Sequence, residues 1–167
     1  MDASKILLLA VVLTACAVVF QVIGLASPYW IFADLPSSKI YSGLWKTCLD
    51  VEGVDSACTD LKNATDWLEA VRAMSILGFL ALLVSAVATA LKLFIMNEQK
   101  PILIVAIVTA FAGAAFILIS IAVYAAKMSE LNTGDIYKFH FAFAFCILGM
   151  LAGLGGGVLM LIEMMKG

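Results

Sequence analysis

Four long stretches of the chain consist almost entirely of apolar residues, and polar residues gather between them. The stretches run over 6–26, 73–96, 102–126 and 139–163. Each reaches the roughly 20 apolar residues that a helix needs to cross the hydrocarbon layer of a membrane. They lack the polar-apolar alternation of a membrane barrel strand, and a helix satisfies its own backbone groups in lipid. The pattern therefore predicts an all-α membrane protein, a four-transmembrane-helix bundle.

The first stretch has a second interpretation, as a cleaved signal peptide. Gly24-Leu25-Ala26 has the small residues of a cleavage site. The apolar run is, however, longer than the ~7–15 residues of a signal core. Cleavage would also separate Trp30 from the helix before it. We therefore interpret this stretch as the first span.

The polar connectors between the stretches differ in length. The connector at 97–101 predicts a tight hairpin between the second and third helices. Loop two, at 127–138, contains a turn signal at 132–135. Loop one, at 27–72, is long enough to form a small folded layer. The whole chain, 1–167, is predicted to form a single membrane domain.

Composition supports the membrane interpretation and excludes several functions. Hydrophobic residues make up 64% of the 167 residues and charged residues 13%, with a mean hydropathy of +1.10. Soluble domains have about 45–50% and about 25%. The net charge of -2 gives no reason to expect nucleic acid as a partner. We find no paired carboxylates in a span, no nucleophile–histidine set in loop one and no phosphate-binding loop. We therefore predict no catalysis, no cofactor and no metal site.

Loop one carries the features that orient the chain. Cys48 and Cys58 are the only cysteines outside the spans, and their spacing suits a hairpin disulfide in an oxidising compartment. Two free thiols are the alternative. Asn63-Ala64-Thr65 is an N-glycosylation sequon in the same loop. Lysine and arginine counts are ambiguous, so these features predict extracellular loops, cytosolic termini and a plasma-membrane location.

A motif in loop one is specific enough to indicate a family. Trp30 is followed by Gly43-Leu44-Trp45, then by the cysteine pair, and then by Arg72 before the second span. Its order and spacing resemble the signature of the claudin superfamily. That group includes the claudins, peripheral myelin protein, the epithelial membrane proteins, the lens fibre membrane protein and the calcium-channel gamma subunits.

Two further segments, 66–77 and 137–141, are most similar to the myelin and epithelial membrane protein branch. The resemblance implies that loop one forms a small extracellular antiparallel β-sheet above the bundle, with the cysteine pair as its disulfide. The segment 31–42 is shorter than in typical claudins, and this predicts reduced first strands. The local pattern predicts a strand-like region at 38–49 and a polar turn at 50–57.

The large side chains of the motif have alternative roles. Trp45 is predicted to pack with Leu44 and fasten the sheet to the helix ends. Trp30 suits that role and an anchor at the membrane interface equally well. Arg72 either extends to water along the helix end or binds loop carbonyl groups.

Small residues recur at four-residue spacing in three of the spans, where they let helices approach closely in lipid. We predict that they pack inside the bundle rather than form a dimer face. The rows are Gly149, Gly153 and Gly157 in the last span, Ala81, Ser85 and Thr89 in the second, and Ala106, Ala110 and Ala114 in the third.

For two other polar features of the sequence we favour a role without a specific function. The lone histidine, His140, is predicted to have no metal-binding or pH-sensing role. The acidic residues of loop one either bias a path between cells towards cations or form a solvated turn, and we favour the turn. These residues are Asp50, Glu52, Asp55 and Asp60.

The resemblance implies a membrane scaffold that mediates cell–cell adhesion or junction formation. Its extracellular loops and lateral self-association would build the contact. An auxiliary subunit that binds and modulates an ion channel or receptor is the alternative, because the superfamily contains both. The predicted partners are membrane lipid and either a second copy or another membrane protein. The exposed edge of the loop-one sheet is the predicted contact surface.

Overall fold

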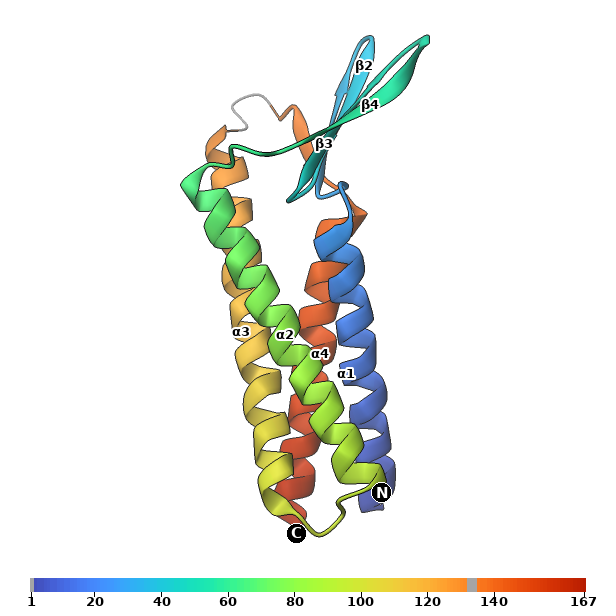
Figure 1. Cartoon of the computed structure of the whole chain (residues 1–167), viewed down its shortest axis with the longest axis vertical. Coiled ribbons are helices and arrows are strands. Elements are labelled where there is room, and N and C mark those ends of the chain that lie inside the picture. The colour runs from blue at the N-terminus through green and yellow to red at the C-terminus, as the bar shows by residue number, and fades with distance from the viewer. Residues whose placement is uncertain (1, 132–134) are drawn as a thin grey trace.

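The computed structural model describes residues 2–131 and 135–167. Within them lie four helices that are long and apolar enough to cross a membrane, which confirms the predicted four-helix bundle (Figure 1). α1 packs along α4 and α2 along α3. Both termini and the α2–α3 connection lie at one end, the turn end, and a β-sheet lies at the other, the sheet end (Figure 1). The helices are α1 (Ala3–Ala26), α2 (Asp66–Phe94), α3 (Lys100–Leu131) and α4 (Phe141–Lys166).

The helix α2 begins at Asp66, well before the apolar stretch that predicted it. Thr65 is its N-cap residue, and Asp66 and Glu69 lie in its first turn. Carboxylates there interact favourably with the positive end of the helix dipole, so the helix continues beyond the apolar stretch into polar sequence. Arg72 consequently lies inside the helix rather than at its start.

The helices α2 and α3 approach each other closely at a pair of glycines, Gly78 and Gly113. A Cβ atom added to Gly113 would lie 3.0 Å from the carbonyl oxygen of Gly78 and 3.1 Å from the backbone nitrogen of Leu82. Backbone atoms cannot move aside as a flexible side chain can. Both glycines escaped the sequence analysis because neither belongs to a repeated row of small residues.

Buried hydroxyl groups connect the same two helices. Ser85 Oγ donates to the carbonyl oxygen of Ala106 at 2.8 Å. Ser75 Oγ lies 2.6 Å from Ser120 Oγ, which in turn donates to the carbonyl oxygen of Val71 at 3.2 Å. These polar side chains are therefore satisfied within the bundle, as a group away from water must be.

The predicted glycine row of α4 faces three different helices of the same chain. A Cβ atom on Gly149 would lie 3.1 Å from the carbonyl oxygen of Ala17 on α1. One on Gly153 would meet a side-chain carbon of Leu82 on α2 at 2.6 Å, and one on Gly157 would meet Ala110 on α3 at 3.2 Å. α4 thus approaches all its neighbours through positions without side chains.

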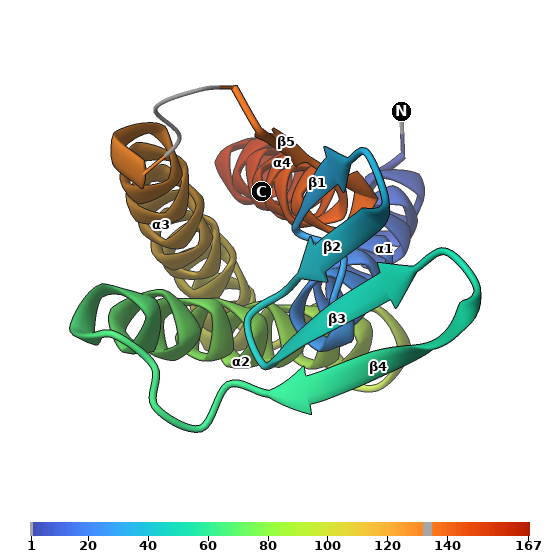
Figure 2. The same ribbon diagram turned by 90° about the horizontal axis from the view of Figure 1, so that it is seen from above.

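The sheet consists of five antiparallel strands in the order β4-β3-β2-β1-β5 (Figure 2). Loop one supplies the first four strands, and β5 comes from the segment between α3 and α4. The antiparallel sheet beside the bundle confirms the predicted fold class. The strands are β1 (Ile31–Leu35), β2 (Ser38–Ser42), β3 (Lys46–Val51), β4 (Val54–Asp60) and β5 (Tyr137–Phe139).

The first two strands have five residues each, and a two-residue turn connects Leu35 to its partner Ser38. Two details of the sheet differ from the sequence predictions. The predicted polar turn at 50–57 is mostly strand, and the chain turns at Gly53, whose φ of 86° suits glycine. Loop two contributes β5, which was predicted only as a connector. Most of its predicted turn, 132–134, lies outside the described residues.

Candidate functional site: the sheet and its attachment to the bundle

Trp30 lies between the end of α1 and β1, and its side chain is completely buried. The indole Nε1 donates to the carbonyl oxygen of Gly24 at 2.6 Å, one of the last carbonyls of α1 that have no partner within the helix. The indole ring packs edge-on against Tyr124 of α3 and Phe143 of α4. Of the two roles left open for Trp30, the structure therefore shows interior packing and not an anchor in the membrane interface.

Trp45 also forms a hydrogen bond to the end of α1, but it is partly exposed instead of buried. Its Nε1 donates to the carbonyl oxygen of Leu25 at 2.9 Å, while 39% of the residue remains exposed. Leu44, its neighbour, is fully buried. Trp45 therefore fastens the sheet through a hydrogen bond, and Leu44 and Trp30 supply the buried apolar contact.

The side chain of Arg72 connects α2 to the loop that bears the motif. Its Nε donates to the carbonyl oxygen of Leu44 at 2.7 Å, and one terminal nitrogen donates to that of Leu61 at 3.1 Å. The guanidinium carbon lies 4.8 Å from the ring centroid of Trp45, in the range of a cation–π contact. Of the two roles considered for Arg72, the structure therefore shows carbonyl binding.

Gly43 lies where the chain of β2 passes over the end of α1. A Cβ atom at this position would lie 2.5 Å from the carbonyl oxygen of Ser27 and 2.6 Å from the Cα atom of Pro28. Only glycine fits such a close approach of two backbones. Gly43, Leu44, Trp45 and Arg72 thus form one junction, in which the strand crosses the helix end, buries an apolar side chain and is held by a guanidinium group.

We predict that Gly43→Ala destabilises the protein by at least about 1–3 kcal/mol, the usual cost of overpacking. The expected result is a lower midpoint of thermal unfolding in detergent, because the obstructing atoms belong to the backbone. Gly155→Ala is the matched control, since its added carbon would meet only the end of the Leu13 side chain at 3.4 Å. Equal stability of the two variants would contradict the role given to Gly43.

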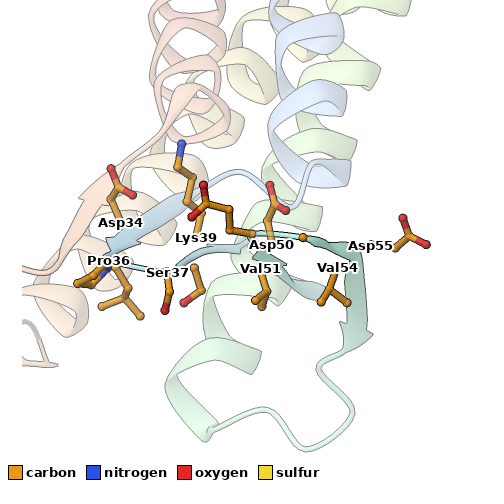
Figure 3. Close-up of a pocket in the computed structure, with 12 residues that line it drawn as sticks. Asp34, Pro36, Ser37, Lys39, Asp50, Val51, Val54 and Asp55 are labelled. Atoms are coloured by element: carbon orange, nitrogen blue, oxygen red, sulfur yellow. The ribbon is translucent and has the colours of Figure 1, made fainter.

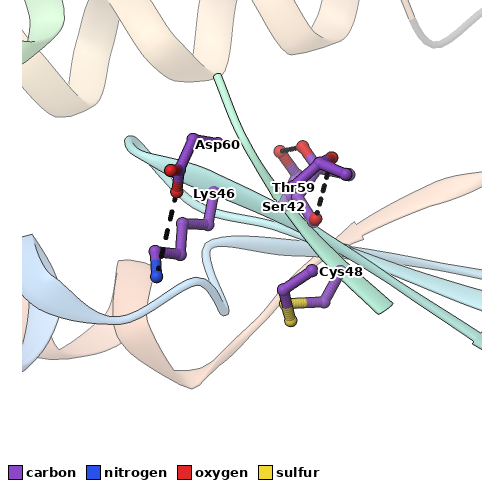
Figure 4. The surroundings of a disulfide bond; sticks show 7 residues. Ser42, Lys46, Cys48, Thr59 and Asp60 are labelled. Carbon is purple, nitrogen blue, oxygen red and sulfur yellow. Dashed lines mark hydrogen bonds and ion pairs between the residues drawn. A yellow bond between two sulfur atoms is a disulfide. The ribbon is translucent and has the colours of Figure 1, made fainter. Parts of the chain in front are cut away.

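The predicted disulfide is present and joins the strands β3 and β4 (Figure 4). Cys48 and Cys58 are directly opposite each other in the strand register. An exposed ion pair joins the same strands, with Lys46 Nζ 3.8 Å from a carboxylate oxygen of Asp60. An exposed pair of this kind adds little stability, so of these two side-chain connections between β3 and β4 the disulfide is the stronger.

We predict that Cys48→Ser or Cys58→Ser lowers the free energy of unfolding by roughly 2–3 kcal/mol, the value expected for a short closed loop. Surface delivery should fall with it. Cys16→Ala is the control, because that cysteine is free. Intact mass under non-reducing conditions provides the direct check, and two free thiols in the wild-type protein would contradict the pairing.

The tips of the two hairpins lie side by side and line a shallow cavity of about 550 Å³ (Figure 3). Its charged side chains are mainly acidic, but Lys39 is opposite Asp34 in one strand pair and opposite Asp50 in the next. Figure 3 places these three side chains on the same side of the sheet. Lys39 therefore offsets part of the acidic charge at the tips.

Several aromatic side chains pack around His140, which is the N-cap residue of α4. Its ring lies 5.6 Å from that of Tyr29, 5.3 Å from Phe32 and 5.9 Å from Tyr41. Its backbone nitrogen donates to the carbonyl oxygen of Trp30 at 2.8 Å. Sequence reasoning missed this cluster, because the aromatic residues meet only once the sheet has formed.

Asn63 is exposed in the connection between β4 and α2. Thr65, the third residue of the sequon, is also exposed and is the N-cap of α2. The sequon is therefore at the surface of the sheet end. Its glycosylation stays a prediction.

A comparison with known proteins identifies a family that includes the motif of this junction. A model of the PMP-22/EMP/MP20/Claudin family matches residues 4–160, which include the whole sheet and every residue of the motif. The search of curated proteins gave no match. The match extends over nearly the whole chain, so the chain belongs to the PMP-22/EMP/MP20/Claudin family of membrane proteins.

Proposed function

We propose that this protein is a membrane scaffold that mediates cell–cell adhesion or junction formation through its sheet and through lateral self-association. The observation that carries the proposal is the exposure of β4 at the edge of the sheet. All seven of its residues are exposed, and it is the last strand on its side of the five-stranded sheet. An unpaired strand edge can hydrogen-bond to a strand of another chain.

The attachment of β4 makes it suitable for such a contact. The disulfide fixes β4 to β3, and the junction around Arg72 holds the following segment through Leu61. A strand that is already ordered loses less conformational entropy on binding than a flexible loop does. The edge is therefore preorganised for a partner.

A second copy of the same strand is the partner that β4 fits best. Two antiparallel β4 strands paired about Ala57 would place Asp55 opposite Thr59 and Val54 opposite Asp60, by their order in the sequence. No two carboxylates would then lie directly opposite each other. Like charges that are directly opposite destabilise a strand pair. Small residues would meet at the centre of the contact.

The same features support an extracellular position for the sheet end at the plasma membrane. A disulfide persists in an oxidising compartment, and the exposed sequon at Asn63 lies at the same end of the bundle. Both termini and the α2–α3 connection lie at the other end (Figure 1). They would then face the cytosol.

The proposal predicts that Ser56→Lys with Ala57→Lys abolishes enrichment at cell–cell borders. Paired copies would bring lysines opposite one another, and lysines on an edge strand prevent edge pairing. The variant is to be expressed in cells that lack such contacts, with the border signal measured relative to total surface protein. Folding should be unaffected, because both side chains are exposed.

The matched control is Leu35→Lys with Ser37→Lys, which adds the same charge at the exposed tip of the neighbouring hairpin. It should leave border enrichment intact. Normal enrichment of the β4 variant would refute the edge contact. Absence of enrichment in the wild type, together with recovery of an ion channel on purification, would favour the role of an auxiliary subunit.

A further inference from the structure

A cavity of about 460 Å³ lies at the turn end of the bundle, away from the sheet. All four helices and the α2–α3 connection contribute to its walls. Its volume is within the range of small-molecule sites. Because it lies where the helices end, it is at the depth of lipid headgroups if the bundle spans a bilayer. Its apolar lining includes Leu7, Leu93, Leu103 and Ile104.

Three charged side chains line this cavity among the described residues: Lys92, Lys100 and Glu163. Lys92, near the end of α2, donates to the backbone carbonyl of Asn97 in the connection. An ammonium group has three donors, so Lys92 keeps capacity for a ligand. Lys100 is the first residue of α3 and lies beside the positive end of that helix. This wall of the cavity therefore favours anionic groups.

Glu163 of α4 adds a negatively charged group to the lining of the cavity. One carboxylate oxygen of Glu163, Oε2, is buried and has no hydrogen-bond partner among the described residues. A buried carboxylate oxygen without a donor is costly. Glu163 itself lines the cavity, which therefore presents two cationic side chains, from α2 and α3, and one carboxylate, from α4.

We propose that this cavity binds the headgroup of phosphatidylserine. That headgroup carries a phosphate and a carboxylate, which match the two lysines, and an ammonium group, which matches the carboxylate of Glu163. Leu93 and Leu103 contact the glycerol backbone and the first carbons of the acyl chains. The inference does not depend on the adhesion proposal, because the cavity and the sheet are at opposite ends of the molecule.

The experiment uses the full chain, purified in detergent and stripped of lipid, and measures lipid adducts by native mass spectrometry. Four lipids with the same acyl chains are titrated: phosphatidylserine, phosphatidylglycerol, phosphatidylethanolamine and phosphatidylcholine. We expect phosphatidylserine to bind most tightly. Lys92→Ala with Lys100→Ala should weaken it about twenty-fivefold, about fivefold for each lysine beside an anionic lipid.

The matched control is Lys5→Ala with Lys166→Ala. It removes the same charge at the same end of the bundle from residues that do not line the cavity. Its effect on phosphatidylserine should be less than about twofold, because exposed charges outside the site are screened. Equal losses in the two double variants would show diffuse attraction to anionic lipid and would overturn the proposal.

Glu163→Gln tests the ammonium position separately. The variant should lose affinity for phosphatidylserine and phosphatidylethanolamine while retaining phosphatidylglycerol, which has no ammonium group. It also keeps the proposal open to refutation if the double lysine variant does not fold. Wild-type protein that binds phosphatidylglycerol as tightly as phosphatidylserine, or a Glu163→Gln variant that keeps the original preference, would each refute the assignment.

Discussion

Replacing Trp30 by alanine should destabilise the protein by about 3–5 kcal/mol, the range for removing a large buried aromatic side chain. The substitution empties the space between α1, α3 and α4 and removes the hydrogen bond to the carbonyl oxygen of Gly24. The midpoint of thermal unfolding in detergent measures the effect. Reduced delivery to the cell surface should accompany it.

Two variants separate the packing from the hydrogen bond. Trp30→Phe keeps an aromatic ring but loses the indole N–H, and it should cost less than the alanine variant. Trp45→Phe removes the corresponding hydrogen bond at a partly exposed position and should cost about 1 kcal/mol. Trp30→Ala with a stability within about 1 kcal/mol of wild type would show that the indole is not the centre of the junction.

The second large effect is expected for Arg72→Met, which should cost about 2–4 kcal/mol. Methionine preserves much of the aliphatic length but donates to neither Leu44 nor Leu61, and each bond from a charged donor contributes about 1.5–3 kcal/mol before solvent exposure reduces it. Limited proteolysis of loop one is the most direct measurement. Cleavage there should accelerate more than cleavage of the α2–α3 connection.

Arg72→Lys is the control for charge. A lysine keeps the positive charge but cannot place two fixed donors and stack on Trp45 as a planar guanidinium does. We expect it to fall between wild type and Arg72→Met. If the lysine variant resists proteolysis as well as wild type, a cation alone is sufficient, and the geometry of the two carbonyl bonds is not what holds the loop.

The parts of this fold that sequence predicts well are those with a strong one-dimensional pattern. Continuous apolar runs identify four helices, because lipid accepts apolar side chains on every face of a helix. Two cysteines outside the spans identify the disulfide in the same way. The motif around Gly43 was recognised by resemblance, and its physical reason, a strand crossing a helix end, appears only in three dimensions.

The features that escaped prediction depend on contacts between distant segments. β5 has three residues and exists because β1 offers it a neighbour, with Ile31 opposite Phe139. The crossing of α2 and α3 at Gly78 and Gly113 leaves no periodic trace in either helix. The two candidate roles of Trp30 need the same residue type at the same boundary, so only the packing of α3 and α4 around it distinguishes them.

The pairing of β1 with β5 has a consequence for exchanging segments between members of the family. β5 comes from a part of the chain more than 60 residues beyond the end of loop one, yet it completes the same sheet. A chimera that receives loop one alone would combine a foreign β1 with the resident β5, and side chains such as Phe32 and Lys138 would face partners from another protein. Loop one and loop two therefore form a single structural unit. Binding specificity should transfer between relatives only when both loops are exchanged together.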